Sequence, residues 1–443
     1  MEYDVVVIGG GTAGYVAGSI LARRNKRVLV IEKNKFGGVC VNSGCVPSIF
    51  LFDATFLLSR LNEIGNYLGI DANAEITPSL FSKRNDIVEY LSDTGRKLVE
   101  NSGAETIIGE AKIISRNEIK LDSKIIKFKK LVIATGTTAK TPNIEGIENA
   151  ISEDEAVNLN CKPSSMIIIG GGYAGVEIAQ FFSRLGTDVT LLSKSRLLRT
   201  FPDEARSVIK ESLEFDGVNV VENVNIERIY GEKVYTNKGI FKGEIIVYAT
   251  GRKPQLPEGI EKLNLNINSN GIVVDEYMNA GENVYAIGDV VDKERKTAHS
   301  AIFDAIISSL HILNDKITVR RNNFKIPQVI YTDPQVGIVG NIYEAKKFST
   351  FPFNATTRSI INGLREGYVK IGINEENEVV FGEVIGNKAE ELINILTIIV
   401  NSKMRVESLV LMPFVHPSLS EAMVNAAKGF FGLDVDNYKS ENE

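Results

Sequence analysis

Short apolar runs alternate along this chain with glycine-rich turns and with segments whose apolar residues recur at helical spacing. The first such unit, residues 3–32, reads YDVVVIGGGTAGYVAGSILARRNKRVLVIE. It contains an apolar run, a glycine turn, a segment of helical period and a second apolar run that ends at Glu32. This order predicts a buried strand, a helix and a neighbouring strand, which together open an α/β domain.

The same unit recurs about 160 residues later, at residues 164–199, with Val189–Leu192 as its second strand. Another pair of similar segments supports an internal repeat, because an apolar strand leads to Ala-Thr-Gly at 134–136 and again at 249–251. A third marker, NVYAIGDVV, predicts a strand that ends at Gly288 and Asp289. We therefore predict an α/β chain with two Rossmann-like dinucleotide-binding domains.

Length and charge narrow the class of protein. A chain of 443 residues is too long for one ordinary core, and 44% hydrophobic with 24% charged residues is typical of a globular protein. The net charge of −6 provides no basic surface for nucleic acid or an anionic membrane. No uninterrupted apolar run reaches spanning length, and the N-terminus lacks the features of a signal peptide. We predict a cytoplasmic protein with neither nucleic acid nor membrane as partner.

The glycine-rich turns give the first indication of a function, which is the binding of a dinucleotide. Gly9, Gly11 and Gly14 have the spacing that lets backbone N–H groups approach a pyrophosphate at a helix N-terminus. Glu32, at the end of the second strand, is placed to hydrogen-bond a ribose diol. The second unit repeats the spacing at the positions Gly170, Gly172 and Gly175. Two such cradles predict two dinucleotides.

Two of the three cysteines lie close together, in GGVCVNSGCVPSIFL at residues 37–51. Three cysteines exclude a disulfide scaffold, and a close pair in a reducing compartment is catalytic or metal-binding. The three histidines have no ligand spacing to Cys40 and Cys45, so we predict no metal site. Apolar residues at helical spacing from Pro47 onward place both sulfurs near a helix N-terminus, which favours thiolate. We interpret Cys161 as an inert thiol.

Together these motifs resemble the pyridine nucleotide-disulfide oxidoreductases, the flavoenzyme family of dihydrolipoamide dehydrogenase, glutathione reductase and mercuric reductase. The resemblance runs nearly end to end and includes KIPQVIYTDPQVGIVG from Lys325 and HPSLSE at 416–421. It implies FAD at the first cradle, NAD(P) at the second, and a C-terminal α+β dimerisation domain. The implied domains are 1–150 with 256–324 for FAD, 151–255 for NAD(P), and 325–443 for dimerisation.

The resemblance also implies the roles of individual residues. Cys40 and Cys45 form the redox disulfide, with Cys45 against the flavin and Cys40 attacking a small disulfide substrate. His416, oriented by Glu421, carries the proton and completes the active site of the other subunit in a homodimer. The implied cofactor-binding residues are Gly9, Gly11, Gly14, Glu32, Lys33, Gly38, Ala111, Thr135, Gly136, Gly170, Gly172, Tyr173, Gly175, Glu177, Ser193, Lys194, Arg199, Gly251, Asp289 and Ala298.

Two departures from the family pattern matter. Family members carry a lysine three or four residues after the second cysteine, paired with the glutamate that matches Glu177, whereas this chain has Ser48 and Ile49. The position equivalent to Glu32 in the second unit is Ser193, followed by Lys194 and, further on, Arg199. Hydroxyls and cations without a carboxylate favour the 2′-phosphate of NADP(H) over NAD(H).

Three functions stay open at this point. The first is an FAD-dependent NAD(P)H:disulfide oxidoreductase similar to dihydrolipoamide dehydrogenase. The second is an FAD-dependent NAD(P)H oxidase or a reductase of quinone or metal acceptors, which the missing lysine at Ile49 suggests. The third is a non-catalytic redox sensor. The joint presence of Cys40, Cys45, His416 and Glu421 favours the first, and the cysteine-free C-terminal tail argues against mercury reduction.

Overall fold

The computed structural model describes residues 2–71 and 74–437. It divides into two compact units. Unit 1 comprises Met1–Leu51, Pro78–Cys161 and Val247–Asn323, and unit 2 comprises Phe52–Thr77, Lys162–Ile246 and Phe324–Glu443. These units cut the chain differently from the three predicted domains, whose limits stay a prediction.

Unit 1 is built on an eight-stranded sheet. Its strands are β1 (Glu2–Ile8), β2 (Val28–Glu32), β3 (Glu105–Ile108), β4 (Ala111–Ser115), β5 (Glu118–Leu121), β6 (Lys124–Ile133), β19 (Asn279–Gly281) and β20 (Val284–Ala286). The order is β19-β20-β6-β1-β2-β3, with β5 paired to β6 and β4 to β5. Strands β20, β6, β1, β2 and β3 are parallel, and β1 and β2 are buried over most of their length and read as apolar runs.

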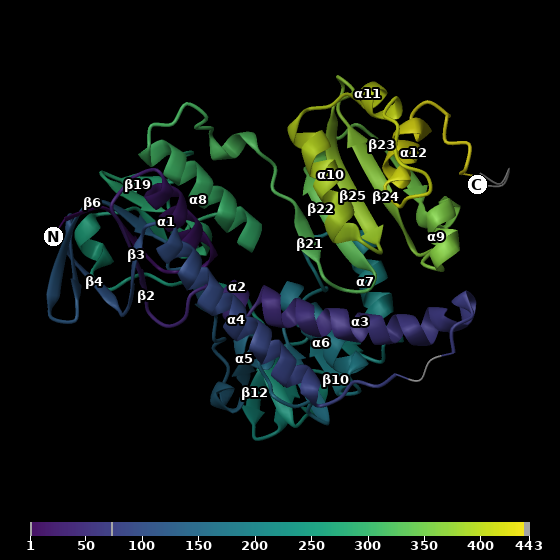
Figure 1. Ribbon diagram of the computed structural model, residues 1–443. Helices are drawn as coiled ribbons and strands as arrows, with labels where there is room; N and C mark the ends of the chain where they lie inside the picture. The colour runs from purple at the N-terminus through teal and green to yellow at the C-terminus, as the bar shows by residue number, and fades with distance from the viewer. Residues whose placement is uncertain (1, 72–73, 438–443) are drawn as a thin grey trace. The chain divides into compact units, whose positions relative to one another are not determined.

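The helices that lie wholly in unit 1 carry much of the candidate site. They are α1 (Thr12–Arg23), α2 (Gly38–Asn42), α4 (Ser79–Asn101), α5 (Glu153–Ala156) and α8 (Ala298–Ile312). Helices α1 and α8 lie side by side (Figure 1). The remaining strands of the unit are the pairs β7 (Thr137–Ala139) with β16 (Arg252–Pro254) and β17 (Ile267–Asn268) with β18 (Gly271–Ile272), and β8 (Ile151–Ser152) beside the end of β15 (Ile245–Tyr248).

The turn between β1 and α1 depends on close backbone contact. Gly9 has φ 107°, a left-handed conformation that glycine adopts without strain. A side chain at Gly14 would collide with the carbonyl oxygen of Gly9. Gly9 N–H donates to the Ile31 carbonyl at 2.8 Å, which joins the turn to β2. The glycines therefore let α1 begin directly against the end of the sheet.

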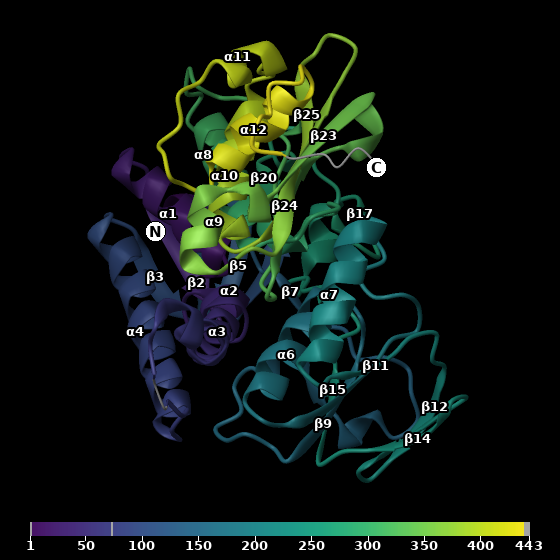
Figure 2. The same cartoon turned by 90° about the vertical axis from the view of Figure 1, so that its right-hand side faces the viewer.

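Unit 2 repeats this arrangement. Its parallel strands are β9 (Ser165–Ile169), β10 (Asp188–Leu192) and β11 (Asn219–Val221), and its helices in this part are α6 (Tyr173–Arg184) and α7 (Asp203–Phe215), which lie side by side (Figure 2). Gly170 N–H donates to Leu192 O at 2.9 Å, and Leu198 N–H donates to Gly171 O at 2.8 Å. The first unit has the same two bonds, from Gly9 to Ile31 and from Gly37 to Gly10. The predicted internal repeat thus extends to individual backbone hydrogen bonds.

The C-terminal part of unit 2 is a five-stranded antiparallel sheet. Its order is β21-β22-β25-β24-β23, built from β21 (Gln328–Ile330), β22 (Gln335–Gly340), β25 (Val379–Gly386), β24 (Gly367–Ile373) and β23 (Lys347–Pro352). Helix α10 (Ala389–Asn401) packs on β22 and β25 (Figure 1), where Gly337 and Gly382 leave room for Ile393 and Leu396. The other elements of unit 2 are β12 (Ile226–Tyr230), β13 (Lys233–Thr236), β14 (Gly239–Lys242), α9 (Thr357–Asn362), α11 (Val406–Val410) and α12 (Glu421–Gly429).

Helix α3 (Cys45–Leu68) carries the chain from unit 1 into unit 2. By length and composition alone, the stretch Gly38–Leu68 is apolar enough to cross a membrane, although it contains charged residues. One of them, Arg60, forms an ion pair with Asp333 at 2.6 Å. One such stretch is weak evidence for a membrane span, and the cytoplasmic location stays a prediction.

A buried carboxylate in the antiparallel sheet is only half satisfied. Glu383 of β25 is fully buried, and the Tyr368 hydroxyl donates to its Oε1 at 2.8 Å. Its Oε2 is buried with no hydrogen-bond partner among the described residues. Burial raises the pKa of Glu383, while Tyr368 and Lys370 oppose the rise. A raised pKa in the folded state means that folding holds the proton more tightly than the unfolded chain does.

We expect Glu383 to lower the free energy of unfolding as the pH rises from about 5 to the raised pKa of this carboxyl, because over that range the folded chain keeps a proton that the unfolded chain has lost. Glu383→Gln keeps the shape without the ionisable group, so it should flatten this slope and raise the unfolding free energy at alkaline pH by about 1–3 kcal/mol. Urea unfolding over a pH series measures both. The exposed Glu376→Gln is the matched control; an identical slope for Glu383→Gln and wild type would contradict the assignment.

Candidate active site

The two close cysteines lie at the junction of two helices. Cys40 is in the middle of α2, and Cys45 is the first residue of α3. The helix therefore begins two residues before the predicted Pro47; proline is tolerated there because first-turn N–H groups need no partner within the helix. Both residues are thiols, and their side chains are hydrogen-bonded to each other. The structure thus brings the two cysteines of the predicted redox pair together.

The surroundings of Cys40 join the cysteine pair to the first glycine turn. Its sulfur is hydrogen-bonded to the Thr12 side chain, the first residue of α1. The pKa of the Cys40 thiol is lowered, first by the hydrogen bond with Cys45 and then by that with Thr12, while burial and the charge of Asp289 oppose the shift. Cys40 is half-buried and Cys45 is exposed. A thiol with a lowered pKa is the form suited to disulfide exchange.

The cradle of the first repeat fits a dinucleotide such as FAD. Gly11 stands just before α1 in extended conformation, and a side chain at Gly38 would come within 2.8 Å of the Gly11 Cα atom. Glu32 ends β2 as predicted, and its Oε2 accepts from Gly10 N–H at 2.7 Å. Its Oε1 accepts from Asn34 N–H at 2.8 Å. The turn is thus free of side chains at Gly11 and Gly38, and two backbone N–H groups hold the Glu32 carboxylate beside it.

The buried carboxylate of Asp289 has one oxygen that no described residue satisfies. The strand β20 ends at Ala286, three residues before Asp289, which lies in a short 3₁₀ turn. The Asp289 Oδ1 is buried and has no hydrogen-bond partner in the described part of the chain. Burial raises the pKa of this carboxyl, although Lys293 and Lys296 lower it. A cofactor hydroxyl would satisfy this oxygen, which agrees with the role implied for Asp289.

The other residues predicted on the flavin side lie within unit 1. Lys33 pairs with Glu110 at 2.6 Å, and the Thr135 hydroxyl donates to the Gln255 carbonyl. Gly136 has positive φ, and so does Gly251, which belongs to the predicted NAD(P) set although it lies in unit 1. Ala111 is buried at the start of β4, and Ala298 begins α8. None of these contacts identifies a ligand by itself.

The second glycine turn has the same backbone geometry as the first, but different side chains surround it. Gly172 precedes α6 in extended conformation, and a side chain at Gly175 would collide with the Gly170 carbonyl oxygen. Tyr173 packs edge-on against Phe201. Ser193 is buried against Gly171, at the place that Glu32 takes in the first repeat.

Cations and one carboxylate surround the turn after Ser193. Lys194 and Arg199 are exposed. Glu222 accepts from Leu197 N–H at 2.7 Å and from Lys210 at 3.2 Å. Burial alone would raise the pKa of Glu222, but these two bonds outweigh it and the pKa is lowered. The turn is therefore basic at its surface, with Glu222 kept ionised beside it.

Glu177 has a partner that the sequence did not indicate. Its Oε1 accepts a hydrogen bond from Tyr331 N–H at 2.9 Å. The family position of the lysine is taken by Ile49, which is half-buried in α3. The backbone of a distant segment thus supplies a donor to the Glu177 carboxylate.

His416 and Glu421 form the second predicted pair. His416 Nδ1 donates to Glu421 Oε1 at 2.8 Å, and Glu421 Oε2 accepts from Ser418 N–H at 2.7 Å. Glu421 begins α12. The His416 side chain is 66% exposed, so its Nε2 is accessible to solvent in the single chain. This pair belongs to unit 2 and the cysteine pair to unit 1.

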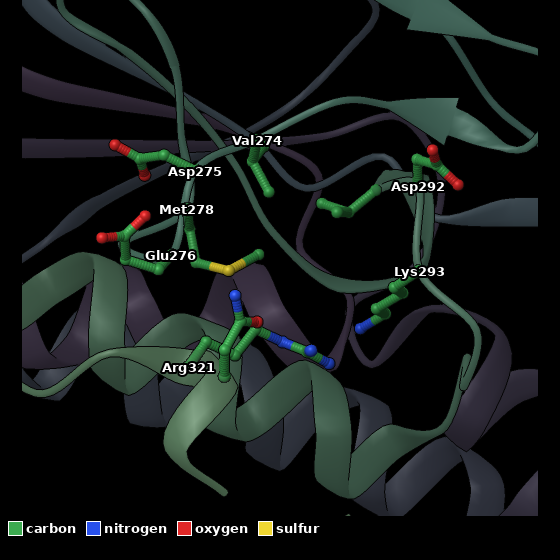
Figure 3. Close-up of a pocket in the computed structure, with 9 residues that line it drawn as sticks. Val274, Asp275, Glu276, Met278, Asp292, Lys293 and Arg321 are labelled. Carbon is green, nitrogen blue, oxygen red and sulfur yellow. The ribbon is translucent and has the colours of Figure 1, made fainter.

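A cavity of about 200 Å³ in unit 1 lies apart from the predicted catalytic residues. It is lined in part by Lys293 and Arg321, both of which pair with the buried Asp304. Figure 3 shows the carboxylates of Asp275 and Glu276 on the side away from Lys293. The cations here are already neutralised in part by Asp304, and the cavity contains neither cysteine.

Sequence reasoning missed some residues that contact the site. Thr12 lies between two fingerprint glycines, so its place beside the cradle was visible in the sequence, but its contact with Cys40 was not. Asn158 donates to the Asn42 carbonyl at 2.9 Å, and no motif marks it. Only the fold brings such residues to the segment that carries Cys40 and Cys45.

Two family models match the chain. Residues 3–305 match a model described as pyridine nucleotide-disulphide oxidoreductase, and residues 326–427 match the dimerisation domain of the same family. The second match supports a homodimer.

Curated relatives cover almost the whole chain. A dihydrolipoyl dehydrogenase from Mycoplasma pneumoniae is 27% identical over 97% of this chain and 98% of its own length. One from Geobacillus stearothermophilus is 28% identical over 98% and 97%. A mercuric reductase from Bacillus cereus is 29% identical over 90% of this chain and 67% of that protein.

Solved structures agree in fold. The HOCl-induced flavoprotein disulfide reductase RclA from Escherichia coli superposes with a TM-score of 0.86 at 23% identity, covering 96% of this chain and 99% of that one. LpdA from Mycobacterium tuberculosis has the same TM-score and identity, over 96% and 98%. The predicted α/β fold class is confirmed. The chain belongs to the pyridine nucleotide-disulphide oxidoreductase family and is an FAD-dependent NAD(P)H:disulfide oxidoreductase.

Proposed function

We propose that Cys40 and Cys45 are the redox pair through which this enzyme reduces a small disulfide. The observation that carries the proposal is the contact of Cys40 with both Cys45 and Thr12, at the head of the glycine cradle. When bound, FAD supplies the chemistry that passes a hydride's two electrons from NAD(P)H to the cysteines. The chain's own residues bind that cofactor, hold the two sulfurs within reach of each other, and move protons.

The exchange has two steps. The Cys40 thiolate attacks one sulfur of the substrate disulfide; the substrate S–S bond breaks, a mixed disulfide forms, and the leaving thiolate takes a proton. The Cys45 thiolate then attacks the Cys40 sulfur, which releases the second substrate thiol and forms the Cys40–Cys45 disulfide. NAD(P)H and a proton restore both thiols. The lowered pKa of Cys40 supports its role as the attacking group.

His416 is proposed as the proton carrier. Its Nδ1 is held by Glu421, so its Nε2 can accept and return a proton. The exposure of this side chain in the single chain is consistent with a place at the redox pair of the other subunit. We propose an active site shared across the homodimer.

The domain limits are proposed as residues 1–150 with 256–324 for FAD, 151–255 for the nicotinamide nucleotide and 325–443 for dimerisation. The remaining residues of the two predicted sets contact FAD or NAD(P) as the family resemblance implies. A cytoplasmic location is part of the same proposal. An oxidase or a redox sensor would not need the pair formed by His416 and Glu421.

We propose NADP(H) as the preferred nicotinamide. Ser193 takes the place of a ribose-binding carboxylate, and Lys194 and Arg199, in the segment that follows it, are exposed. Glu222 is close to the same turn, but Lys210 balances its charge. The 2′-phosphate of NADP(H) would then contact hydroxyl groups and cations, and the nearby carboxylate has its charge balanced by a lysine.

The Cys40 thiol should titrate below the ordinary range of a thiol. In the Cys161→Ser protein, the rate of Cys40 alkylation by iodoacetamide, followed by peptide mass spectrometry over a pH series, should rise to a plateau with a lowered midpoint. Cys45→Ala removes the largest cause of the shift and should move the midpoint upward. A midpoint that does not respond to Cys45→Ala would show that the two sulfurs do not interact.

His416→Gln should lower turnover of lipoamide, as a small test disulfide, by about 10²–10⁴-fold. Reduction of the cysteine pair by the nicotinamide in a single turnover should be unchanged, because that half-reaction does not use the histidine. His311→Gln, at the end of α8, is the control. Equal turnover for wild type and His416→Gln would remove the histidine from the mechanism.

The ratio of kcat/KM for NADPH to that for NADH should favour NADPH. The double variant Lys194→Ala with Arg199→Ala should lower kcat/KM for NADPH by about tenfold or more, the effect of losing a charge-assisted hydrogen bond, and leave NADH use unchanged. Lys233→Ala, at the exposed first residue of β13, is the matched control. A tenfold preference of wild type for NADH would contradict the proposal.

A further inference from the structure

We propose that Asn158 is a positioning residue for the redox loop, residues 36–45. Its side-chain amide holds the loop in the shape that brings the Cys40 and Cys45 sulfurs together, and the buried Arg84 holds Asn158 in place. The proposal rests on the proposed role of the two cysteines as the redox pair.

The redox loop is tied together from inside by Asn42, two residues after Cys40. Asn42 Nδ2 donates to the Phe36 carbonyl and to the Gly38 carbonyl, both at 2.9 Å. Two carbonyl acceptors fix the orientation of this amide, because only its nitrogen can donate. These bonds join the last residue of α2, the short helix that carries Cys40, to the residues at its start.

Two residues outside the loop anchor it. Asn158 Nδ2 donates to the Asn42 carbonyl at 2.9 Å and to the Asp154 carbonyl at 3.0 Å. The buried Ser92 of α4 donates its hydroxyl to the Phe36 carbonyl at 2.8 Å. One anchor therefore holds each end of the segment that contains Cys40.

Arg84 of α4 anchors the segment that carries Asn158. Its side chain is 1% exposed, and its guanidinium donates to the carbonyls of Val157 and Leu159 at 2.8 Å and of Asn158 at 3.2 Å. Its other acceptors are the side-chain oxygens of Asn85 and Asn160. A buried guanidinium whose acceptors in the described residues are neutral oxygens is a costly arrangement, and here it fixes three successive carbonyls.

The loop packs on α4 through α2, but part of its border faces a hollow. A hollow of about 270 Å³ lies between the loop and α4, lined by Lys35, Asn42, Asn85, Val88, Glu89 and Asn158. No protein side chain fills that space, so the Asn158 hydrogen bond limits how far the loop can shift toward it. Loss of the Asn158 amide would let the loop relax into the hollow.

The expected consequence is a change in the redox equilibrium. A loop held with its two sulfurs in contact gives each thiol a high effective concentration toward the other, which favours the intramolecular disulfide. Without the Asn158 tether the disulfide should be less favoured against glutathione. The loss of one neutral hydrogen bond corresponds to about a fivefold change in the exchange constant, which is about 20 mV for this two-electron couple.

The test compares the holoenzyme of wild type, Asn158→Ala, Ser92→Ala and Asn149→Ala. Each is equilibrated anaerobically in a series of reduced and oxidised glutathione buffers, trapped with an alkylating agent, and the Cys40–Cys45 peptide is quantified by mass spectrometry. Asn149 is the matched control, because its amide also donates to a backbone carbonyl, that of Gly146 at 2.9 Å, outside the loop. Thermal unfolding of each variant is measured alongside.

We expect Asn158→Ala and Ser92→Ala each to lower the exchange constant about fivefold, and Asn149→Ala to leave it unchanged. An exchange constant equal to wild type in both loop variants, with or without a lower unfolding temperature, would overturn the inference and reduce Asn158 to a structural residue. If wild type itself forms no Cys40–Cys45 disulfide in any buffer, the proposed function fails instead.

Discussion

The carbonyl oxygen of Gly9 occupies the space that a side chain at position 14 would need, and this close approach organises unit 1. Because Gly14 has no side chain, α1 begins directly at the end of β1, with Thr12 as its first residue. The absence of side chains at Gly11 and Gly38 lets the redox loop lie against the same turn. The backbone surface that fits a dinucleotide and the sulfur of Cys40 therefore meet at Thr12.

The same approach, between Gly170 and Gly175, builds the second cradle, yet the two copies serve different ends. In the first copy the chain after β2 passes through Gly37 and Gly38 into the cysteine loop. In the second copy the equivalent turn reaches Leu198, whose N–H still donates to Gly171 O, but no cysteine follows. The carboxylate of Glu32 is replaced by Ser193. The same backbone arrangement is thus followed by two cysteines in the first copy, and in the second copy it has a serine in place of the carboxylate.

Much of this organisation follows from local pattern. The strand that ends at Glu32 and the contact of His416 with Glu421 come from short-range periodicity and spacing, which the chain obeys. The start of α3 at Cys45 differs from the predicted Pro47, because apolar spacing does not register the first helical turn and proline can stand inside it.

Contacts between residues far apart in the chain could not be predicted from the sequence. The bond from Tyr331 N–H to Glu177 and the anchor of Asn158 on Asn42 join residues far apart in the chain. Asparagine is also common in loops for local reasons, so nothing distinguishes Asn158 before the fold is known. The buried oxygen of Asp289 likewise became visible only as an unmet hydrogen bond in the folded chain.

The central claim is that reducing equivalents are stored in the sulfurs of Cys40 and Cys45 as well as in bound flavin. Anaerobic dithionite titration of the purified holoenzyme, followed by its visible spectrum, tests this most directly. We predict that wild type takes up twice the electrons that its flavin alone accepts, and that Cys40→Ser takes up only the flavin's share. A wild-type protein that is fully reduced by the flavin's share alone would contradict the account.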